Sequence, residues 1–249
     1  MPSEKMSHIV VTPVKNEVDF LRQTIDSMSK QTFLPSEWII VDDFSTDGSR
    51  KILEDAEKEF EWIKLVKMND ESNRERGMKI AKLINLGLER SDTEWSFLSK
   101  IDADIILPKN YFESIISEFE NDDELGIGSG NCFVERFGKN KVEKVELDHT
   151  RGALKTYRNE CLSEIGGIRE VDGWDGFDNT MAQFHGWKTK NFSHILAEHR
   201  RKTGSNDGLM RNIFWSGRKS HILRYSWPYL LAKGFSQMVK WPYFIGGIY

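Results

Sequence analysis

The sequence predicts an α/β fold in which a doubly wound, mostly parallel sheet is flanked by helices. Short apolar runs rich in β-branched residues alternate with amphipathic segments over residues 1–107. Such runs are typical of strands buried on both faces, and regular strand–helix alternation is typical of parallel sheets. The chain has 249 residues, which suits one large domain, and its 39% hydrophobic and 30% charged residues are typical of a globular protein.

The first half is expected to run strand, helix, strand, helix, strand, helix, strand. Apolar runs predict strands at residues 8–14, 38–41, 63–68 and 95–101. Apolar residues at helical spacing predict helices at residues 18–30, 50–60 and 77–90. The run Ser45-Thr46-Asp47-Gly48-Ser49 supplies the turn and capping residues expected ahead of the second helix.

The alternation weakens after Pro108. We expect a helix at residues 111–119, a Gly-rich strand at 126–133, charged turn-like sequence up to Asp148, a short helix at 175–184 and a strand end at 195–199. The expected organisation is one domain over residues 1–221, with a first half at 1–107 and a mixed second half at 108–221, followed by an aromatic helical tail at 222–249.

Composition excludes some classes of function. The formal net charge of -4 gives no electrostatic reason to bind nucleic acid, so no nucleic-acid partner is expected. The two cysteines, Cys132 and Cys161, are too few for a disulfide framework and are expected to be small buried side chains. The N-terminal apolar run is too short for a signal peptide or a membrane span, so we expect a cytoplasmic location.

Carboxylates follow the apolar runs where ligands of an open α/β sheet bind. Asp42-Asp43 ends the second predicted strand, and Asp102-Ala103-Asp104 ends the fourth. Converging carboxylates repel one another, and a divalent cation removes that penalty. Mg²⁺ or Mn²⁺ would suit such oxygen ligands together with substrate phosphates. A lone Asp-X-Asp also occurs in turns and helix caps, which is the alternative interpretation.

These runs resemble family 2 glycosyltransferases of the GT-A fold. The resemblance rests on Thr12-Pro13-Val14-Lys15-Asn16-Glu17, on Val41-Asp42-Asp43-Phe44-Ser45-Thr46-Asp47-Gly48-Ser49 and on Asp102-Ala103-Asp104. It covers about residues 6–200. It implies a metal-dependent, inverting transfer of a sugar from a nucleotide donor, best matched by a UDP-sugar, to a saccharide or lipid-linked acceptor in glycan or polysaccharide biosynthesis. Residues 1–107 would then bind the nucleotide, and residues 108–221 the acceptor.

The resemblance also implies roles for donor-side residues. Asp43 matches the aspartate that accepts the imide N–H of uracil, while Asp42 would orient the loop. The nucleoside pocket would be lined by the backbone of Thr12 and Pro13 and by Glu17, although Glu17 could equally be a first-turn acid of the next helix. Asp102 would face the ribose or the water shell of the metal, beside Ala103, and Asp104 would ligate Mn²⁺ or Mg²⁺. Lys79 matches an Arg position near the diphosphate, within the segment that begins at Asn73.

Acceptor-side residues have a counterpart as well. Gly173-Trp174-Asp175-Gly176-Phe177-Asp178 resembles the segment that carries the catalytic base of inverting members. Phe177 stands where a Glu is frequent, so two candidates remain. Aligning the Trp-x-Gly-x-Asp pattern favours Asp178, which we prefer, whereas counting back from Gly186 gives Asp175. Their spacing would put both on one helical face.

His199 matches a position where metal-dependent relatives carry a further metal ligand. It ends a predicted strand and precedes the basic run Arg200-Arg201-Lys202, which could clamp phosphates. The alternative is a hydrogen-bonded structural histidine.

The tail at 222–249 combines aromatic residues with Arg224, Lys233 and Lys240 but has no run long enough to span a membrane. It could contact the inner face of the cell membrane as an interfacial segment, or pack beneath the catalytic domain. A truncated C-terminus would also explain its abrupt end.

Two other functions compete with the transferase. A sugar nucleotidyltransferase would need a Gly-rich basic loop after the first strand, and the loop at 12–17 has no glycine. A non-catalytic binder of nucleotide sugars or glycans that has lost its base is kept open by Phe177.

Overall fold

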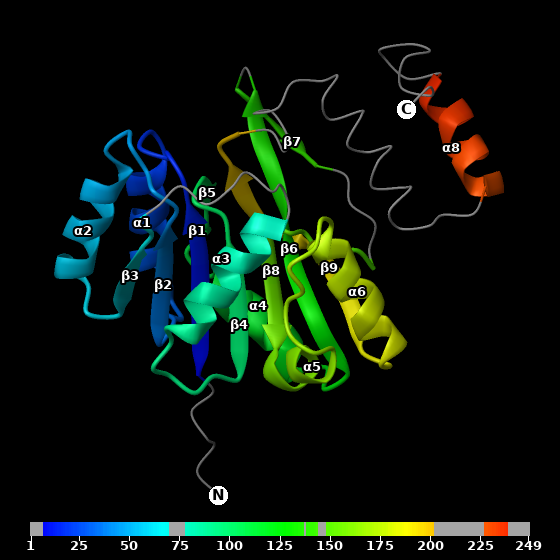
Figure 1. Ribbon diagram of the computed structural model, residues 1–249, viewed down its shortest axis with the longest axis horizontal. Coiled ribbons are helices and arrows are strands. Elements are labelled where there is room, and N and C mark those ends of the chain that lie inside the picture. The colour runs from blue at the N-terminus through cyan, green and yellow to red at the C-terminus, as the bar shows by residue number, and fades with distance from the viewer. Residues whose placement is uncertain (1–6, 70–77, 137, 144–147, 202–226, 239–249) are drawn as a thin grey trace, which may run out of the picture. The chain divides into compact units, whose positions relative to one another are not determined.

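The computed structural model describes residues 7–69, 78–136, 138–143, 148–201 and 227–238 (Figure 1). The chain divides into two compact units, Met1–Arg200 and Arg201–Tyr249. The first unit holds all the described strands and helices α1 to α6, and the second contributes one described helix, α8 (Trp227–Met238). The predicted domain limit between residues 221 and 222 stays a prediction.

The predicted alternation of strands and helices is confirmed in the first half. The elements are β1 (His8–Val14), α1 (Leu21–Ser29), β2 (Glu37–Asp42), α2 (Ser49–Glu59), β3 (Ile63–Lys67), α3 (Met78–Glu89), β4 (Phe97–Ile101) and β5 (Ile105–Ile106). The second half contains α4 (Tyr111–Glu120), β6 (Leu125–Arg136), β7 (Lys139–Val142), β8 (Leu154–Arg158), α5 (Asn159–Glu164), α6 (Trp174–Phe184) and β9 (Lys188–His199).

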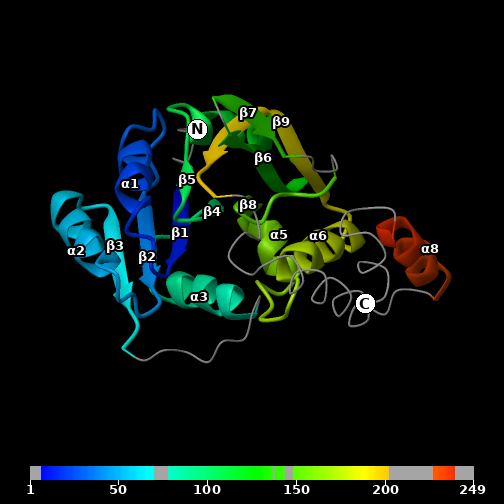
Figure 2. The same ribbon diagram turned by 90° about the horizontal axis from the view of Figure 1, so that it is seen from above.

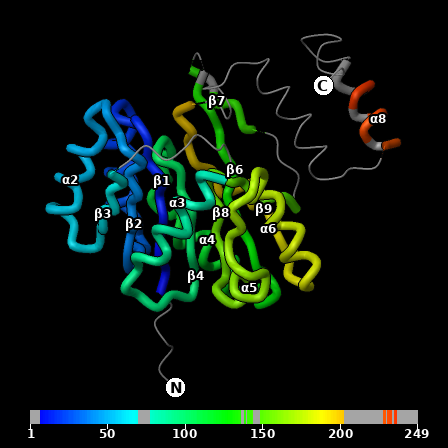
Figure 3. Tube along the Cα trace, in the orientation of Figure 1, coloured from blue at the N-terminus to red at the C-terminus, as the bar shows by residue number. Residues whose placement is uncertain are grey.

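One nine-stranded sheet runs through the first unit in the order β3-β2-β1-β4-β8-β6-β9-β5, with β7 paired to β6. Strands β1 to β4 are all parallel, as expected for a doubly wound half. Strand β8 then runs antiparallel to both β4 and β6, while β6 and β9 are parallel. Strands β8, β6 and β9 lie side by side in the chain trace (Figure 3). The second half of the sheet is therefore mixed, as the sequence predicted.

Helices cover both faces of this sheet, since alternate residues of each strand point to opposite faces. On β1, Val10 packs in a core cluster with α1, α2 and α4, whereas Ile9 and Val11 pack in a second cluster with α3, α5 and α6. Figure 2 shows α3, α5 and α6 along one face. The crossovers after β1 and β3 thus lie on opposite faces, an arrangement in which ligands typically bind at the carboxyl ends of the neighbouring strands, here β1 and β4.

Three elements of the second half were not predicted. Strand β7 lies within charged sequence that has no strand pattern of its own. It is a strand because it pairs with β6. Strand β8 reads Leu-Lys-Thr-Tyr-Arg, where polar side chains mask a strand that is nonetheless buried. Helix α5 follows it directly and has only six residues, too few for a periodic signal.

The aromatic tail contributes helix α8, as a helical tail was expected. Within the described ranges, no helix combines the length and the apolar character needed to cross a bilayer. Both cysteines are buried, as expected.

Candidate active site

The candidate site lies at the carboxyl ends of β1, β2 and β4. Parallel register aligns Val14 of β1 with Asp42 of β2, so the loops that follow these strands begin side by side. Strand β4 lies on the other side of β1 and leads into Asp102-Ala103-Asp104. The three predicted strand-end segments therefore meet at one edge of the sheet.

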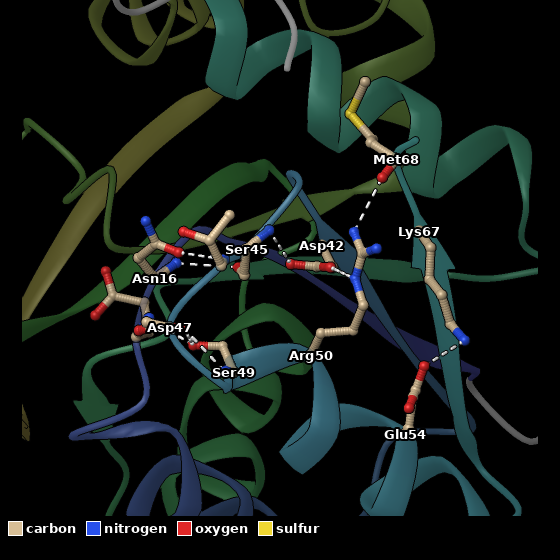
Figure 4. Close-up of polar contacts among 11 residues, drawn as sticks. Asn16, Asp42, Ser45, Asp47, Ser49, Arg50, Glu54, Lys67 and Met68 are labelled. Carbon is tan, nitrogen blue, oxygen red and sulfur yellow. Dashed lines mark hydrogen bonds and ion pairs between the residues drawn. The ribbon is translucent and has the colours of Figure 1, made fainter. Parts of the chain in front are cut away.

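Side-chain hydrogen bonds join the β1–α1 loop to the β2–α2 loop (Figure 4). The backbone N–H of Asn16 donates to Ser45 Oγ at 3.0 Å, and Asn16 Oδ1 accepts from the backbone N–H of Thr46 at 2.8 Å. Asp47 accepts from the backbone N–H of Val18 at 3.1 Å and from the backbone N–H of Ser49 at 2.9 Å. The Ser-Thr-Asp-Gly-Ser run thus acts as a brace between two loops.

Asp42 serves this scaffold, in agreement with the loop-orienting role expected for it. Its carboxylate is fully buried and accepts from Arg50 Nε at 2.6 Å and from the backbone N–H of Ser45 at 3.1 Å. Arg50 also donates to the carbonyl oxygen of Met68 at 3.0 Å, so it connects the ends of β2 and β3 (Figure 4). A buried carboxylate needs such partners because an unpaired one is costly.

Asp43, the predicted base-reading residue, is 1% exposed and lies between two ammonium groups. Lys79 Nζ of α3 is 2.5 Å from Asp43 Oδ2, and Lys15 Nζ is 3.6 Å from the same oxygen. The structure thus places Lys79 beside Asp43, the residue predicted to contact the nucleobase. The backbone N–H of Asp43 donates to the carbonyl oxygen of Val14 at 2.8 Å, which fixes the position of the residue.

The first-strand residues divide into one buried and two partly exposed positions. Thr12 is fully buried, and its hydroxyl accepts from Trp38 Nε1 at 2.9 Å, so its side chain supports the sheet. Pro13 and Glu17 are partly exposed. The carbonyl oxygen of Glu17 accepts from the backbone N–H of Leu21 at 3.0 Å, but Glu17 lies ahead of α1, whose first turn holds no acidic residue, so the alternative of a first-turn acid is wrong.

Each member of the Asp102-Ala103-Asp104 triplet has a different environment. Asp102 Oδ1 pairs with the buried ammonium of Lys100. Ala103 is 4% exposed, and its carbonyl oxygen accepts from the hydroxyl of Thr24 at 2.7 Å, which ties the triplet to α1. Asp104 is the member that approaches a second predicted ligand.

Asp104 and His199 come together because β5 pairs with β9. The register places Ile105 opposite His199, and His199 Nε2 lies 3.4 Å from Asp104 Oδ2. Burial lowers the pKa of His199, but interactions with Asp104 and, next in size, with Cys132 outweigh this effect and raise the pKa to about 9. Two sequence-distant predicted ligands are thus neighbours.

A carboxylate oxygen and an imidazole nitrogen this close together match two ligands of one divalent cation. Among the described residues there is no cluster of three or more His, Cys, Asp or Glu side chains that could hold a metal. Two protein ligands nevertheless fit Mg²⁺ or Mn²⁺, because such ions take the rest of their coordination from substrate phosphates and water.

Asp178 points into the protein, between α6 and β8. It is 1% exposed; Tyr157 donates its hydroxyl to Asp178 Oδ2 at 2.6 Å, and Lys155 Nζ lies 4.0 Å from the same oxygen. Burial raises the pKa of Asp178 to about 6, although Lys155 and Tyr157 act against this shift. Burial likewise lowers the pKa of Lys155 to about 8.

Asp175 lies in the first turn of α6 and is partly exposed. In the described part of the chain its carboxylate has no hydrogen bond or ion pair of its own, although a Cβ added at Gly152 would be 3.0 Å from Asp175 Oδ2. Phe177, where relatives often carry Glu, packs under the guanidinium of Arg169 at 5.0 Å. Spacing of i, i+3 therefore does not place Asp175 and Asp178 in one environment.

Sequence reasoning missed three residues of this region: Lys100, Lys155 and Tyr157. They lie on neighbouring strands, where the register pairs Lys100 with Lys155 and Leu98 with Tyr157. A lysine inside an apolar strand is the signal that could have found them, since buried lysines require partners. Residues 73–77 of the predicted diphosphate segment, and Lys202, lie outside the described residues.

Comparisons of the sequence with known proteins identify the family. Residues 9–215 match the model of the family described as Glycosyl transferase family 2. A Bacillus subtilis protein named for teichuronic acid biosynthesis, the glycosyltransferase TuaG, is 37% identical over 95 residues, which are 38% of this chain and 34% of that protein. The poly-beta-1,6-N-acetyl-D-glucosamine synthase of Staphylococcus epidermidis is 25% identical over 64% of this chain and 36% of its own length. The chain thus spans about a third of these relatives.

Solved structures of low sequence identity share the fold. The mannosyltransferase PcManGT of Pyrobaculum calidifontis, in complex with GDP-Man and Mn²⁺, has a TM-score of 0.67 at 17% identity, with 90% of this chain and 66% of that chain covered. TarS of S. aureus, residues 1–349 with UDP-GlcNAc, has a TM-score of 0.62 at 19% identity, with 80% and 60% covered. The sheet order, the helices on both faces and the family match over most of the chain agree with the expected GT-A-like fold, and the chain belongs to glycosyl transferase family 2.

Proposed function

We propose that this protein is a metal-dependent, inverting glycosyltransferase that moves a sugar from a UDP-sugar to a saccharide or lipid-linked acceptor in polysaccharide biosynthesis. The observation that carries the proposal is the placement of three carboxylates at one edge of the sheet. Asp43 follows β2, Asp104 follows β4, and Asp175 lies beside Gly152, just before the start of β8, which pairs with the end of β4. One edge of the sheet would then hold a carboxylate that contacts the nucleobase, a ligand for the cation and a carboxylate on the acceptor side.

Asp43 and its lysines suit uracil. Uracil presents an imide N–H flanked by two carbonyl oxygens, so the Asp43 carboxylate would accept from the N–H while Lys79 donates to a carbonyl oxygen. Lys79 is close enough to serve both partners, since its Nζ is 2.5 Å from Asp43. Cytosine presents an acceptor nitrogen in place of the imide N–H, so it would face the Asp43 carboxylate with a second acceptor, which is unfavourable. Thr12, Pro13 and Glu17 would border this pocket.

Asp104 and His199 would hold the cation, and Asp102 with Ala103 would border the ribose. The cation, when bound, would neutralise charge that develops on the departing nucleoside diphosphate. Lys100 would orient Asp102, because its buried ammonium already pairs with that carboxylate.

Asp175 is the better placed of the two candidate bases. A general base must come within hydrogen-bond reach of the attacking hydroxyl. Asp175 is partly exposed at the start of α6, whereas Asp178 is 1% exposed and engaged by Tyr157. In a single in-line displacement, the Asp175 carboxylate would take the proton of the acceptor hydroxyl as the new glycosidic bond forms and the diphosphate leaves.

One set of measurements tests the donor side. We expect isothermal titration of UDP with Mn²⁺ to show tighter binding than without it, and Asp104→Ala to remove that difference. GDP serves as the competing nucleotide. Asp123→Ala is the matched control, because this exposed aspartate precedes β6 at the opposite edge of the sheet. Metal-dependent binding that survives Asp104→Ala would overturn the metal assignment.

Turnover with mixed UDP-sugars tests the base. Asp175→Ala should abolish transfer while UDP binding is retained, and Asp178→Asn should keep a measurable rate. An inactive Asp178→Asn together with an active Asp175→Ala would reverse the assignment. Transfer absent from the wild type, with UDP binding intact, would instead favour a non-catalytic sugar-nucleotide binder; the feature favouring that alternative is Phe177, stacked under Arg169 in place of a Glu.

We further propose that the C-terminal unit contacts the inner face of the cell membrane. On α8, the side chains of Trp227, Leu231 and Phe235 repeat every four residues and are 78%, 59% and 68% exposed, so they share one apolar face. No Asp or Glu follows Asp207 in the sequence, whereas lysines and arginines occur at Arg211, Arg218, Lys219, Arg224, Lys233 and Lys240. An aromatic, cationic segment of this kind suits anionic lipid headgroups.

Sedimentation with vesicles tests this contact. The protein should bind vesicles of phosphatidylglycerol and phosphatidylcholine more strongly than phosphatidylcholine alone, and Leu231→Asp should weaken binding. Phe184→Asp is the control, since Phe184 is an exposed aromatic residue of the catalytic unit. Equal loss in both variants would contradict the proposal.

A further inference from the structure

Lys155 lies in the middle of the sheet with its side chain 0% exposed. The antiparallel register sets it opposite Lys100 of β4, so both lysines project from the same face. Their ammonium groups lie 5.6 Å and 5.9 Å from the ring centroid of Trp174. Two neighbouring buried cations are costly unless each has anionic or carbonyl partners. The partners of each lysine therefore indicate which part of the structure the buried charge stabilises.

Strand β8 and helix α6 supply the partners of Lys155. Lys155 and Tyr157 are two residues apart on β8 and share a face, while Trp174 and Asp178 are one turn apart on α6. Tyr157 donates to Asp178 at 2.6 Å, and Lys155 lies 4.0 Å from the same oxygen. These four side chains form a buried cluster between the strand and the helix.

Lys155 also reaches the main chain of the proposed base. Its ammonium donates to the carbonyl oxygen of Asp175. Helix α6 begins after Gly173, which has a φ of 80° and makes no side-chain cap, and Lys155 adds a side-chain bond from the sheet to its first turn. The first turn of α6 carries the Asp175 carboxylate. It is thus held by Lys155, which reaches it from β8, and by the packing of Trp174.

Solvent exposure distinguishes the residues that can contact an acceptor from those that only position others. Neither Lys155 nor Asp178 can touch an acceptor, because their side chains are 0% and 1% exposed. Asp175 is partly exposed one turn earlier on the same helix. The hydrogen bond from Lys155 to the Asp175 carbonyl oxygen therefore connects the buried lysine to the partly exposed carboxylate.

We propose that Lys155 is a positioning residue for the transfer reaction: held by Asp178 and Tyr157, it fixes the first turn of α6 so that Asp175 meets the acceptor hydroxyl. This inference rests on the proposed function, in which Asp175 is the base. Asp178 is then the counter-ion of Lys155 and belongs to the positioning cluster. Misplacing a catalytic group by about 1 Å costs about 100-fold in rate, which sets the size of the expected effect.

The test compares Lys155→Met with Arg158→Met in the full chain. Arg158 is a matched control because it is a partly buried cation on the same strand, and it donates instead to the carbonyl oxygens of Phe119 and Leu125. UDP titration first gives the fraction of binding-competent protein, and kcat is then expressed per binding site. Lys155→Met should lower kcat about 100-fold with the dissociation constant of UDP within about threefold, and Arg158→Met should leave kcat per site unchanged.

A second variant guards against misfolding. Lys155→Met combined with Asp178→Asn removes both buried charges at nearly constant volume and should show the same loss of kcat per site. A kcat per site within threefold of the wild type in either Lys155 variant would overturn the proposal, as would an equal loss in Arg158→Met. Asp175→Ala separates this failure from failure of the proposed function: if Asp175→Ala keeps full activity, the base assignment is wrong, whatever Lys155 does.

Discussion

Removing the buried charges of Lys155 and Asp178 together should stabilise the protein while lowering its activity. Burial raises the pKa of Asp178 from 3.8 to about 6 and lowers that of Lys155 from 10.5 to about 8. Each pKa unit corresponds to about 1.4 kcal/mol, so each group is charged at a cost of about 3 kcal/mol relative to the unfolded chain. This cost is what remains after the attraction between the two ions, which are 4.0 Å apart, because that attraction already acts on both pKa values.

The sign of the pH dependence follows from these shifts. Between about pH 4 and pH 6 the folded protein keeps a proton on Asp178 that the unfolded chain has lost, so the free energy of unfolding falls as pH rises. Between about pH 8 and pH 10.5 the unfolded chain keeps a proton that Lys155 has lost in the folded protein, so the free energy of unfolding rises. The pair therefore contributes least stability near neutral pH.

The double variant Lys155→Met, Asp178→Asn should raise the free energy of unfolding at pH 7 by about 2 kcal/mol, within the range known for replaced buried ion pairs. The amide retains the bond from Tyr157, although its second polar atom takes the place of Asp178 Oδ1, which has no partner. Urea denaturation followed by tryptophan fluorescence at pH 5, 7 and 9 measures the effect, and the gain should be largest at pH 7. A double variant less stable than the wild type at pH 7 would refute the reasoning.

Three other substitutions test the packing of the fold. Gly126→Ala should lower the free energy of unfolding by about 3 kcal/mol, because its Cβ would lie 2.5 Å from Cys161 Sγ and 2.8 Å from Trp187 Cβ; urea denaturation measures this, and a loss below about 1 kcal/mol would mean that α5 can shift. Gly176→Ala should instead raise stability by about 0.5 kcal/mol, since its Cβ would meet only His149 at 3.9 Å within α6, and thermal unfolding that shows a loss would contradict this. Arg50→Met should lower the free energy of unfolding by about 3 kcal/mol and weaken UDP binding, because it leaves the fully buried Asp42 without its cation. An unchanged affinity for UDP by calorimetry would show that the contacts between the two loops do not affect the nucleotide pocket.

The donor half could be predicted from the sequence because its signals are local. Apolar runs, turn residues and the acids after Val41 and Ile101 all lie within a few residues of the features they specify. Asp104 was expected as a metal ligand from its place after a predicted strand and from the resemblance, and His199 from the resemblance and its strand-end position. Their 3.4 Å separation depends on the pairing of β5 with β9, which no local pattern encodes.

The acceptor half was harder for the same physical reason. The choice between Asp175 and Asp178 depends on which face of α6 packs against β8, and β8 itself was missed because its lysine and tyrosine obscure the apolar pattern. Helical spacing indicated one shared face, yet a three-residue step rotates the side chain far enough for Asp178 to be buried against Tyr157 while Asp175 stays at the surface. Burial by a distant strand cannot be read from spacing.

Lys100 connects the donor and acceptor halves, and its removal should therefore affect both. Its ammonium pairs with Asp102 and donates to the carbonyl oxygen of Gly152 at 2.9 Å, and Gly152 lies directly against the Asp175 carboxylate. Hydrogen bonds to charged groups contribute about 1.5–3 kcal/mol, which corresponds to about 10-fold to 100-fold in binding. Lys100→Met should thus weaken UDP-sugar binding about 10-fold and also lower kcat, whereas Lys155→Met should lower kcat alone. Calorimetry and turnover on the two variants measure this difference, and a Lys100→Met variant that retains the wild-type affinity would show that Asp102 keeps its position without the lysine.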